Sequence, residues 1–227
     1  MSIEIDAAGR ATGVLQIASP NCDERPDGAT VCLLVIHNIS LPPGEFGGTG
    51  IVELFTNTLD PAAHPYYAQI AGLKVSAHFL VRRDGAIVQF VATDMRAWHA
   101  GVSQWNGRDR CNDFSIGIEL EGADDCEFAD AQYAALAALT RAVRARYAID
   151  DIVGHVTTEH VLEACPFALL ARQPQADGAQ IGDRQSGLHR AHGQDPVVQK
   201  HEERGHHAHV AKHQQPANPV RHTETEE

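Results

Sequence analysis

Apolar runs alternate with turn-forming segments along the first two thirds of the chain. Residues 31–37 form a run that is apolar up to His37, and such a run predicts a buried strand. The next segment, LPPGEFGG, is rich in proline and glycine, which predicts a loop. In the segment GIVELFTNTL, Ile51, Leu54 and Phe55 share one face of a short predicted helix. The strand therefore carries a histidine to the edge of a loop.

The segment VSAHFLVRRDGAIVQFVA carries the clearest strand signal in the sequence. Two β-rich runs flank Asp84-Gly85, a dipeptide typical of tight turns, so the segment is predicted to form a hairpin. The preceding residues 60–74 include two prolines and two tyrosines, and we expect them to be irregular. The following residues 93–113 are expected to form a long loop, and loops of that length are usually functional or disordered.

The remaining elements complete an alternation of strands and helices. Residues 114–122, FSIGIELEG, and residues 151–155 are predicted strands. Asp130 is a candidate N-cap for a helix that runs to about Tyr147. The apolar residues at helical spacing in this helix are Tyr133, Leu136, Leu139 and Val143. Interleaved strands and helices predict an α/β fold, a single domain with a central mixed β-sheet flanked by helices.

The composition changes near Phe167, after which no aromatic residue occurs. Residues 171–227 are rich in Gln, His, Gly, Arg and Glu and contain few aliphatic residues. Such a segment cannot bury enough apolar area to offset an ordering entropy of about 1–2 kcal/mol per residue. We therefore expect a folded domain over residues 1–168 and a disordered tail over residues 169–227.

The charge of the chain argues against two classes of partner. The 227 residues have a formal net charge of −12, so the chain has no electrostatic reason to bind nucleic acid or an anionic membrane.

The sequence shows neither a signal peptide nor a run of 18 apolar residues, and we expect a cytoplasmic monomer. The five cysteines lack CxxC spacing, which is typical of free thiols in a reducing compartment.

Two histidines at predicted strand ends are candidate metal ligands. His37 and His155 each follow a short apolar strand, and ligands usually converge where strands of an α/β sheet end. Imidazole is a good zinc ligand, and a catalytic zinc keeps three protein ligands and one open position. The alternative is that both are hydrogen-bonded loop residues, and spacing alone leaves the two interpretations open.

Strand alternation isolates a third candidate, Glu119. Ile116 and Ile118 face one side of the predicted strand, whereas Gly117 and Glu119 face the other. Glu119 is either a solvated side chain or a carboxylate that accepts a proton from an attacking water, and Gly117 would leave space beside it. Trp98 and His99 in the long loop could form a cleft wall or a lid. His78 is more typical of a hydrogen-bonded structural histidine.

Four long strings resemble a known family. VIHNISLPPGEFGG, VSAHFLVRRDG, VQFVATDMRAWHAGVSQWNGRDRCNDFSIGIELEG and DAQYAAL closely resemble the cytoplasmic anhydromuramoyl-peptide amidases. These enzymes belong to the zinc N-acetylmuramoyl-L-alanine amidases, which share a fold with phage T7 lysozyme and the peptidoglycan recognition proteins. The similarity extends from about Leu15 to His155.

The resemblance implies a Zn²⁺ in an open cleft and a specific reaction. That reaction is hydrolysis of the amide between the lactyl group of 1,6-anhydro-N-acetylmuramic acid and L-alanine, during cell-wall recycling. By the matching motifs, His37 and His155 correspond to zinc ligands and Glu119 to the general base. The positions that match residues near the muropeptide are Asn38, Lys74, Trp98 and Arg110. The family commonly has arginine where this chain has Lys74, and lysine cannot reproduce a bidentate clamp on a carboxylate.

The sequence departs from the family after His155. The family continues to Lys-x-Asp-Pro, in which the lysine stabilises the oxyanion and the aspartate is the third zinc ligand. This chain reads HVTTEHVLEACPFALL, which puts Glu163 at the lysine position and Cys165 at the aspartate position. Either Cys165 is the third ligand, as in related His, His, Cys amidases, or the sequence after His155 is unrelated to the family.

These alternatives lead to three interpretations of what the protein does. The first is a zinc-dependent amidase, favoured by Glu119. The second is a catalytically impaired protein that binds the muropeptide, favoured by the missing lysine and aspartate. The third is the inactive product of a rearranged gene, which would fold poorly because the closing helix of the family is missing.

Overall fold

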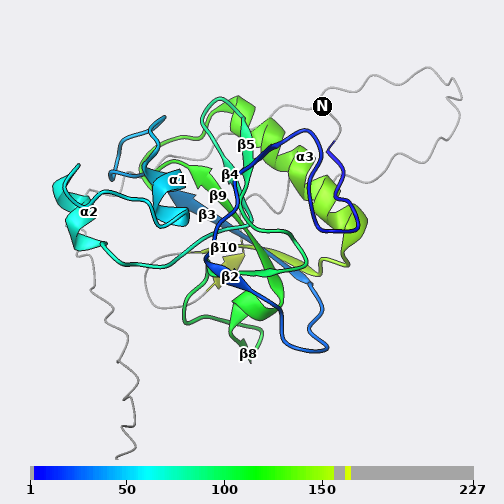
Figure 1. Cartoon of the computed structure of the whole chain (residues 1–227). Helices are drawn as coiled ribbons and strands as arrows, with labels where there is room; N and C mark the ends of the chain where they lie inside the picture. The colour runs from blue at the N-terminus through cyan, green and yellow to red at the C-terminus, as the bar shows by residue number, and fades with distance from the viewer. Residues whose placement is uncertain (1–2, 156–161, 165–227) are drawn as a thin grey trace, which may run out of the picture. The chain divides into compact units, whose positions relative to one another are not determined.

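A computed structural model describes residues 3–155 and 162–164, and in it the chain is built on one seven-stranded sheet (Figure 1). The strand order is β1-β5-β4-β9-β3-β10-β11. In that order the strands are Leu15–Gln16, Ile87–Gln89, Phe79–Val81, Ser115–Glu121, Leu33–Ile39, Asp151–His155 and Leu162–Ala164. Four neighbouring strands, β4, β9, β3 and β10, are parallel. Because β5 pairs antiparallel with β4, and β11 pairs antiparallel with β10, the sheet is mixed, as predicted.

The predicted strands and hairpin are confirmed with small shifts at their ends. Strand β3 begins at Leu33 and continues to Ile39, so His37 lies inside the strand rather than at its end. The hairpin of β4 and β5 turns at Gly85, whose φ of +82° belongs to the left-handed region that glycine favours. The backbone N–H of Arg82 donates to the carbonyl of Ala86 at 2.8 Å and closes this turn.

Helices and short ribbons complete the described structure. The helices are α1, Gly50–Phe55, α2, Pro65–Gln69, α3, Asp130–Arg146, and the 3-10 helix η1, Cys111–Asp113. Two ribbons pair β2, Cys22–Asp23, with β6, Arg96–Ala97, and β7, Gln104–Trp105, with β8, Arg108–Asp109. The expectation that residues 60–74 are irregular is wrong at α2, because Pro65 has the φ of a first helical turn and the ring of His64 accepts the N–H of Tyr66. The long loop 93–113 contains β6, β7, β8 and η1.

Helix α3 begins one residue away from its predicted cap. Asp130 is the first helical residue, and Ala129 is the N-cap. The side chain of Gln132 reaches back to accept the backbone N–H of Ala129 at 3.1 Å, which satisfies a donor at the start of the helix. Leu136, Leu139 and Val143 are buried as expected.

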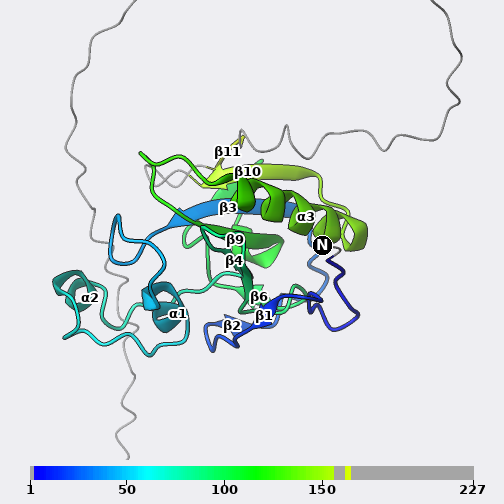
Figure 2. The ribbon, with the colours of Figure 1, turned by 90° about the horizontal axis from the view of Figure 1, so that it is seen from above.

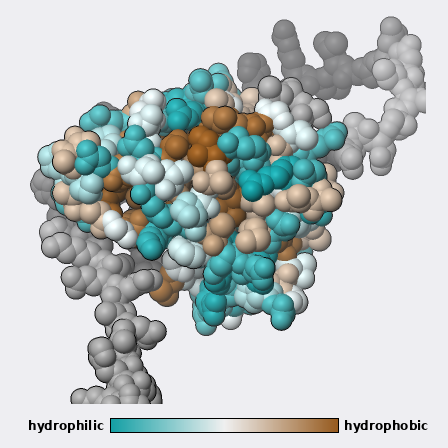
Figure 3. All heavy atoms as spheres, in the orientation of Figure 1, coloured by the Kyte–Doolittle hydropathy of each residue, from teal (hydrophilic) through white to brown (hydrophobic). Residues whose placement is uncertain are grey.

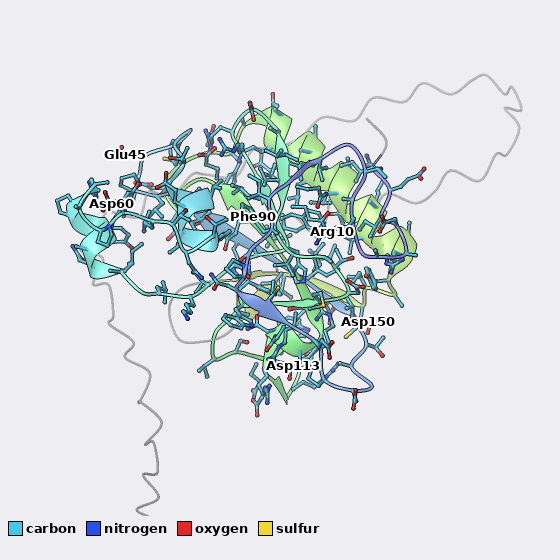
Figure 4. All side chains as sticks on the ribbon, viewed as in Figure 1. Arg10, Glu45, Asp60, Phe90, Asp113 and Asp150 are labelled. Carbon is cyan, nitrogen blue, oxygen red and sulfur yellow. The ribbon has the colours of Figure 1, made fainter. Side chains whose placement is uncertain are left out.

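The two faces of the sheet are covered differently. On one face, α3 packs against Leu34, Ile36, Phe79, Ile116 and Ile118. On the other face, α1 packs against residues that include Leu80, Val88 and Phe90. Both ribbon views show α1 and α2 on the opposite side of the sheet from α3 (Figures 1 and 2). Figure 4 shows Phe90 in the interior, whereas polar residues cover much of the surface in Figure 3.

The described cysteines are all free thiols. They are Cys22, Cys32, Cys111 and Cys126. This agrees with the expectation from their spacing, and Cys165 lies outside the described residues. Among the described helices, none combines the length and the apolar character that crossing a membrane requires. The predicted tail, residues 169–227, also lies outside the described residues, so the domain boundary stays a prediction.

A half-buried arginine ties together the segments that lead into β9. Arg25 donates from one terminal nitrogen to the carbonyls of Asn112 and Asp113 at 3.0 and 3.1 Å. Its other terminal nitrogen donates to the carbonyls of Thr93 and Ser115 at 3.2 and 2.8 Å. Burial lowers the pKa of Arg25 to about 10, so the guanidinium keeps its charge at neutral pH. One side chain therefore fixes the end of η1, the start of β9 and the loop before β6.

Replacing this side chain should cost stability. Arg25→Met leaves four carbonyls without their donor, and a buried group that loses its partner costs about 1–3 kcal/mol. We expect the free energy of unfolding, measured by urea denaturation, to fall by at least about 3 kcal/mol. Arg141→Met, on the exposed face of α3, is the matched control and should change stability by less than about 0.5 kcal/mol. Equal effects of the two substitutions would contradict this role of Arg25.

Candidate functional site

The pairing of β3 with β9 brings two of the predicted site residues together. His37 and Glu119 are register partners in this parallel pair. Leu34, Ile36, Ile116 and Ile118 pack with α3, so strand alternation directs His37 and Glu119 to the opposite face. The structure thus places the first predicted zinc ligand and the predicted general base side by side on one face of the sheet.

His37 is buried and contacts a second histidine. Only 6% of this residue is exposed to solvent. Its Nε2 lies 2.9 Å from Nδ1 of His99, and the two rings meet edge to face at 5.1 Å between centroids. His99 Nε2 lies 3.1 Å from the hydroxyl of Ser115, the first residue of β9. A histidine from the long loop therefore lies directly behind the candidate ligand.

Gly117 makes room for His99. A Cβ at Gly117 would lie 2.4 Å from Cγ of His99, a distance that side chains do not tolerate. The space expected beside Glu119 is real, and the ring of His99 occupies it. A glycine inside a buried strand is a sign of such close approach, which is the sequence signal that could have identified this contact.

Glu119 is a buried carboxyl with an unpartnered oxygen. The residue is 8% exposed, so the interpretation as a solvated side chain is wrong. No described residue donates a hydrogen bond to its Oε2, which is itself buried. Burial raises the pKa of Glu119 from 4.5 to about 8, because the charged form loses its hydration. A carboxyl in this state can hold or release a proton near neutral pH.

His78 is a structural histidine, as the sequence indicated. It is fully buried, and its Nδ1 accepts the backbone N–H of Gly117 at 3.0 Å. Its Nε2 lies 3.1 Å from the carbonyl of Met95, to which it donates. Burial, with a smaller contribution from the charge of Arg25, lowers the pKa of His78 to about 3. His78 is therefore neutral and holds Gly117 in place under His99.

The other predicted zinc ligands are only partly described. His155 is the last residue of β10, one position beyond the register pair Gly154 and Ile36, so its backbone lies on the strand next to His37. The side chain of His155 and all of Cys165 lie outside the described residues. Within residues 3–155, no group of three His, Cys, Asp or Glu side chains could hold a metal ion.

The four predicted substrate contacts lie in different surroundings. Trp98 is half-buried, and its indole N–H donates to Asp23 at 3.1 Å. Arg110 is exposed and pairs with Asp113 at 3.2 Å. Lys74 is exposed. Asn38 lies on the α3 side of the strand by alternation, where its amide donates to Asp124 at 2.7 Å, so the structure does not bring it beside His37 and Glu119.

Residues 27–168 match the family model described as N-acetylmuramoyl-L-alanine amidase. The chain belongs to the N-acetylmuramoyl-L-alanine amidase family. It is 64% identical over 135 residues to 1,6-anhydro-N-acetylmuramyl-L-alanine amidase AmpD of Escherichia coli, a match that covers 60% of this chain and 74% of that protein. It is 51% identical over 150 residues to AmpD of Haemophilus influenzae, with 65% and 82% covered. The resemblance seen in the sequence is confirmed.

Solved structures of family members share the fold. A selenomethionine derivative of AmpD superposes with a TM-score of 0.68 at 54% identity, covering 73% of this chain and 96% of that one. The solution structure of AmpD from Citrobacter freundii gives a TM-score of 0.51 at 51% identity, covering 74% and 96%. The mixed sheet with helices is therefore the fold of this amidase family.

The buried carboxyl should make the stability of the metal-free protein depend on pH. The folded state favours the protonated Glu119, so the free energy of unfolding falls as the pH rises from about 4.5 through about 8. Glu119→Gln removes this titration. We expect the variant to gain stability relative to the wild type by up to about 1.4 kcal/mol for each pH unit in that window.

The measurement is urea denaturation in the presence of a chelator at several pH values. Glu4→Gln, at an exposed position, is the control and should follow the wild type throughout. If the Glu119→Gln and wild-type profiles ran parallel, Glu119 would not be a buried carboxyl of raised pKa.

Proposed function

We propose that the chain is a zinc-dependent amidase that acts on anhydromuramoyl peptides. The scissile bond is the amide between the lactyl group of 1,6-anhydro-N-acetylmuramic acid and L-alanine, and the setting is cell-wall recycling in the cytoplasm. The relatives named for this activity support the proposal. The observation that carries it is the buried carboxyl of Glu119. This residue is the register partner of His37, and its Oε2 has no hydrogen-bond partner among the described residues.

The described residues fit one part of a zinc site. His37 offers a buried imidazole, and the orphaned carboxyl oxygen of Glu119 is a polar atom that the described protein leaves without a partner. His37, His155 and Cys165 are the proposed ligands, a donor set that suits zinc. When bound, zinc lowers the pKa of a water ligand and polarises the amide carbonyl.

Glu119 is proposed to move the proton. A general base must accept a proton from the attacking water and later deliver it to the leaving nitrogen of L-alanine. A raised pKa suits both steps, because the carboxyl can then be protonated or ionised near neutral pH. Its position within a sheet, with strand partners on both sides, supports this role, because a fixed backbone would hold the carboxyl in one place.

The substrate contacts are proposed from the family match. Trp98 is a candidate cleft wall, because Asp23 holds its indole and Ser76 binds its backbone N–H. Arg110 presents an exposed guanidinium that could pair with a peptide carboxylate. Lys74 would attract a peptide carboxylate only as a point charge. Asn38 would contact the substrate only if its amide released Asp124. We further propose a monomer without nucleic-acid or membrane partners, consistent with the charge of −12.

The second candidate function is muropeptide binding without effective catalysis. The sequence that follows His155 favours it, because Glu163 and Cys165 stand where the family has lysine and aspartate. An anion at the lysine position opposes a developing oxyanion. The two functions predict the same ligand and different turnover, so one experiment separates them.

The experiment measures release of free tripeptide from anhydromuramoyl-tripeptide by the full chain, with and without added Zn²⁺. We expect zinc-dependent release that falls by at least about 100-fold in His37→Ala and in Cys165→Ala. His64→Ala, at the start of α2, is the control and should keep the wild-type rate. If the wild type binds the substrate but releases no free tripeptide, the binding function is favoured. If the wild type neither binds nor cleaves the substrate, the proposal is overturned.

A further inference from the structure

A chain of hydrogen bonds runs behind the candidate ligand His37. His37 Nε2 lies 2.9 Å from His99 Nδ1, and His99 Nε2 lies 3.1 Å from the hydroxyl oxygen of Ser115. The Ser115 hydroxyl lies 2.6 Å from the backbone carbonyl of Cys111. The chain therefore starts at an imidazole of the site and ends on the main chain of η1.

The last link sets the direction of the whole chain. The Cys111 carbonyl can only accept a hydrogen bond, so the Ser115 hydroxyl donates its single hydrogen to it. His99 Nε2 must then donate to the Ser115 oxygen. A neutral imidazole has one N–H, so His99 Nδ1 accepts, and His37 donates to it from Nε2. Metal binding requires a neutral imidazole. In neutral His37 the proton is on Nε2, so the lone pair is on Nδ1.

His99 is itself held in position from several sides. Its ring lies on the bare Cα of Gly117, and its backbone N–H donates to the side-chain oxygen of Asn112 at 3.1 Å. The ring of His78 meets it edge to face at 5.7 Å between centroids. Because these contacts fix the ring, His99 can impose both an orientation and a tautomer on its neighbour.

We infer that His99 is a positioning residue that orients His37 and fixes the tautomer with its lone pair on Nδ1, the nitrogen that would then serve as the ligand atom for zinc. An outer partner of this kind fixes the ring and raises the basicity of a metal-binding histidine. The part of the inference that concerns zinc rests on the proposed function. The tautomer follows from the hydrogen bonds alone, so it can be tested without metal.

The first measurement is the tautomer of His37 in the full, metal-free chain. Long-range ¹H–¹⁵N spectra distinguish the protonated ring nitrogen from the bare one, and the His37 signals are identified by their loss in His37→Gln. We expect the proton on Nε2 in the wild type. A proton on Nδ1 would overturn the inference, whatever the chain does with zinc.

The second measurement compares variants at position 99. His99→Phe keeps a ring on Gly117 and removes both hydrogen bonds, so the His37 tautomers should mix and the zinc dissociation constant should rise by about 10- to 100-fold. His99→Asn keeps an acceptor close to the place of Nδ1 and should restore both readouts to within a few-fold of the wild type. Ser115→Ala frees the far end of the chain and should give a smaller change in the same direction.

Zinc affinity is measured by competition with a chromophoric chelator, and His37→Ala gives the background from the other histidines. If His99→Phe keeps one His37 tautomer and the wild-type zinc affinity, His99 is not a positioning residue. If the wild type binds zinc no better than His37→Ala, the proposed function fails, and the spectra of the wild type and His99→Asn still decide the role of His99.

Discussion

The parallel pairing of β3 with β9 is the constraint on which the candidate site depends. It sets His37 opposite Glu119, on the sheet face that α3 does not cover. A shift of one residue in this pairing would turn one strand's side chains to the wrong face. Strands β4 and β10 pair with the outer sides of β9 and β3, so the register is held from both directions. The site is therefore as rigid as the centre of the sheet.

Two glutamates on the same face of β9 show how differently the fold treats buried carboxyls. Glu121 accepts the backbone N–H of Gly47 at 2.6 Å and that of Arg83 at 3.1 Å, so both of its oxygens have donors. Glu119, two residues earlier, has a buried oxygen that no described residue contacts. Glu121 joins the loop after β3 to the hairpin, which is a structural role. An unsatisfied buried group such as Glu119 calls for a functional explanation.

The sequence predicted the elements with regular patterns and missed the contacts between them. Alternation in β9 correctly separated Glu119 from the apolar face, and the Asp84-Gly85 turn was correct because its chemistry is local. The contact of His99 with His37 was not predictable from spacing, because it depends on how a long loop folds back onto Gly117. The contacts of Arg25 were missed for the same reason, since its four acceptors come from two segments, one at Thr93 and one at residues 112–115, that are both far from it in the sequence.

The order of strands also has a consequence for how the chain folds as it is synthesised. Strand β3 is made early, yet its two neighbours in the sheet, β9 and β10, are among the last described strands to leave the ribosome. Pairing between strands so far apart in the sequence is slow to form. During synthesis β3 must therefore remain with the backbone groups of both edges unpaired, and an apolar strand in that state depends on protection from aggregation.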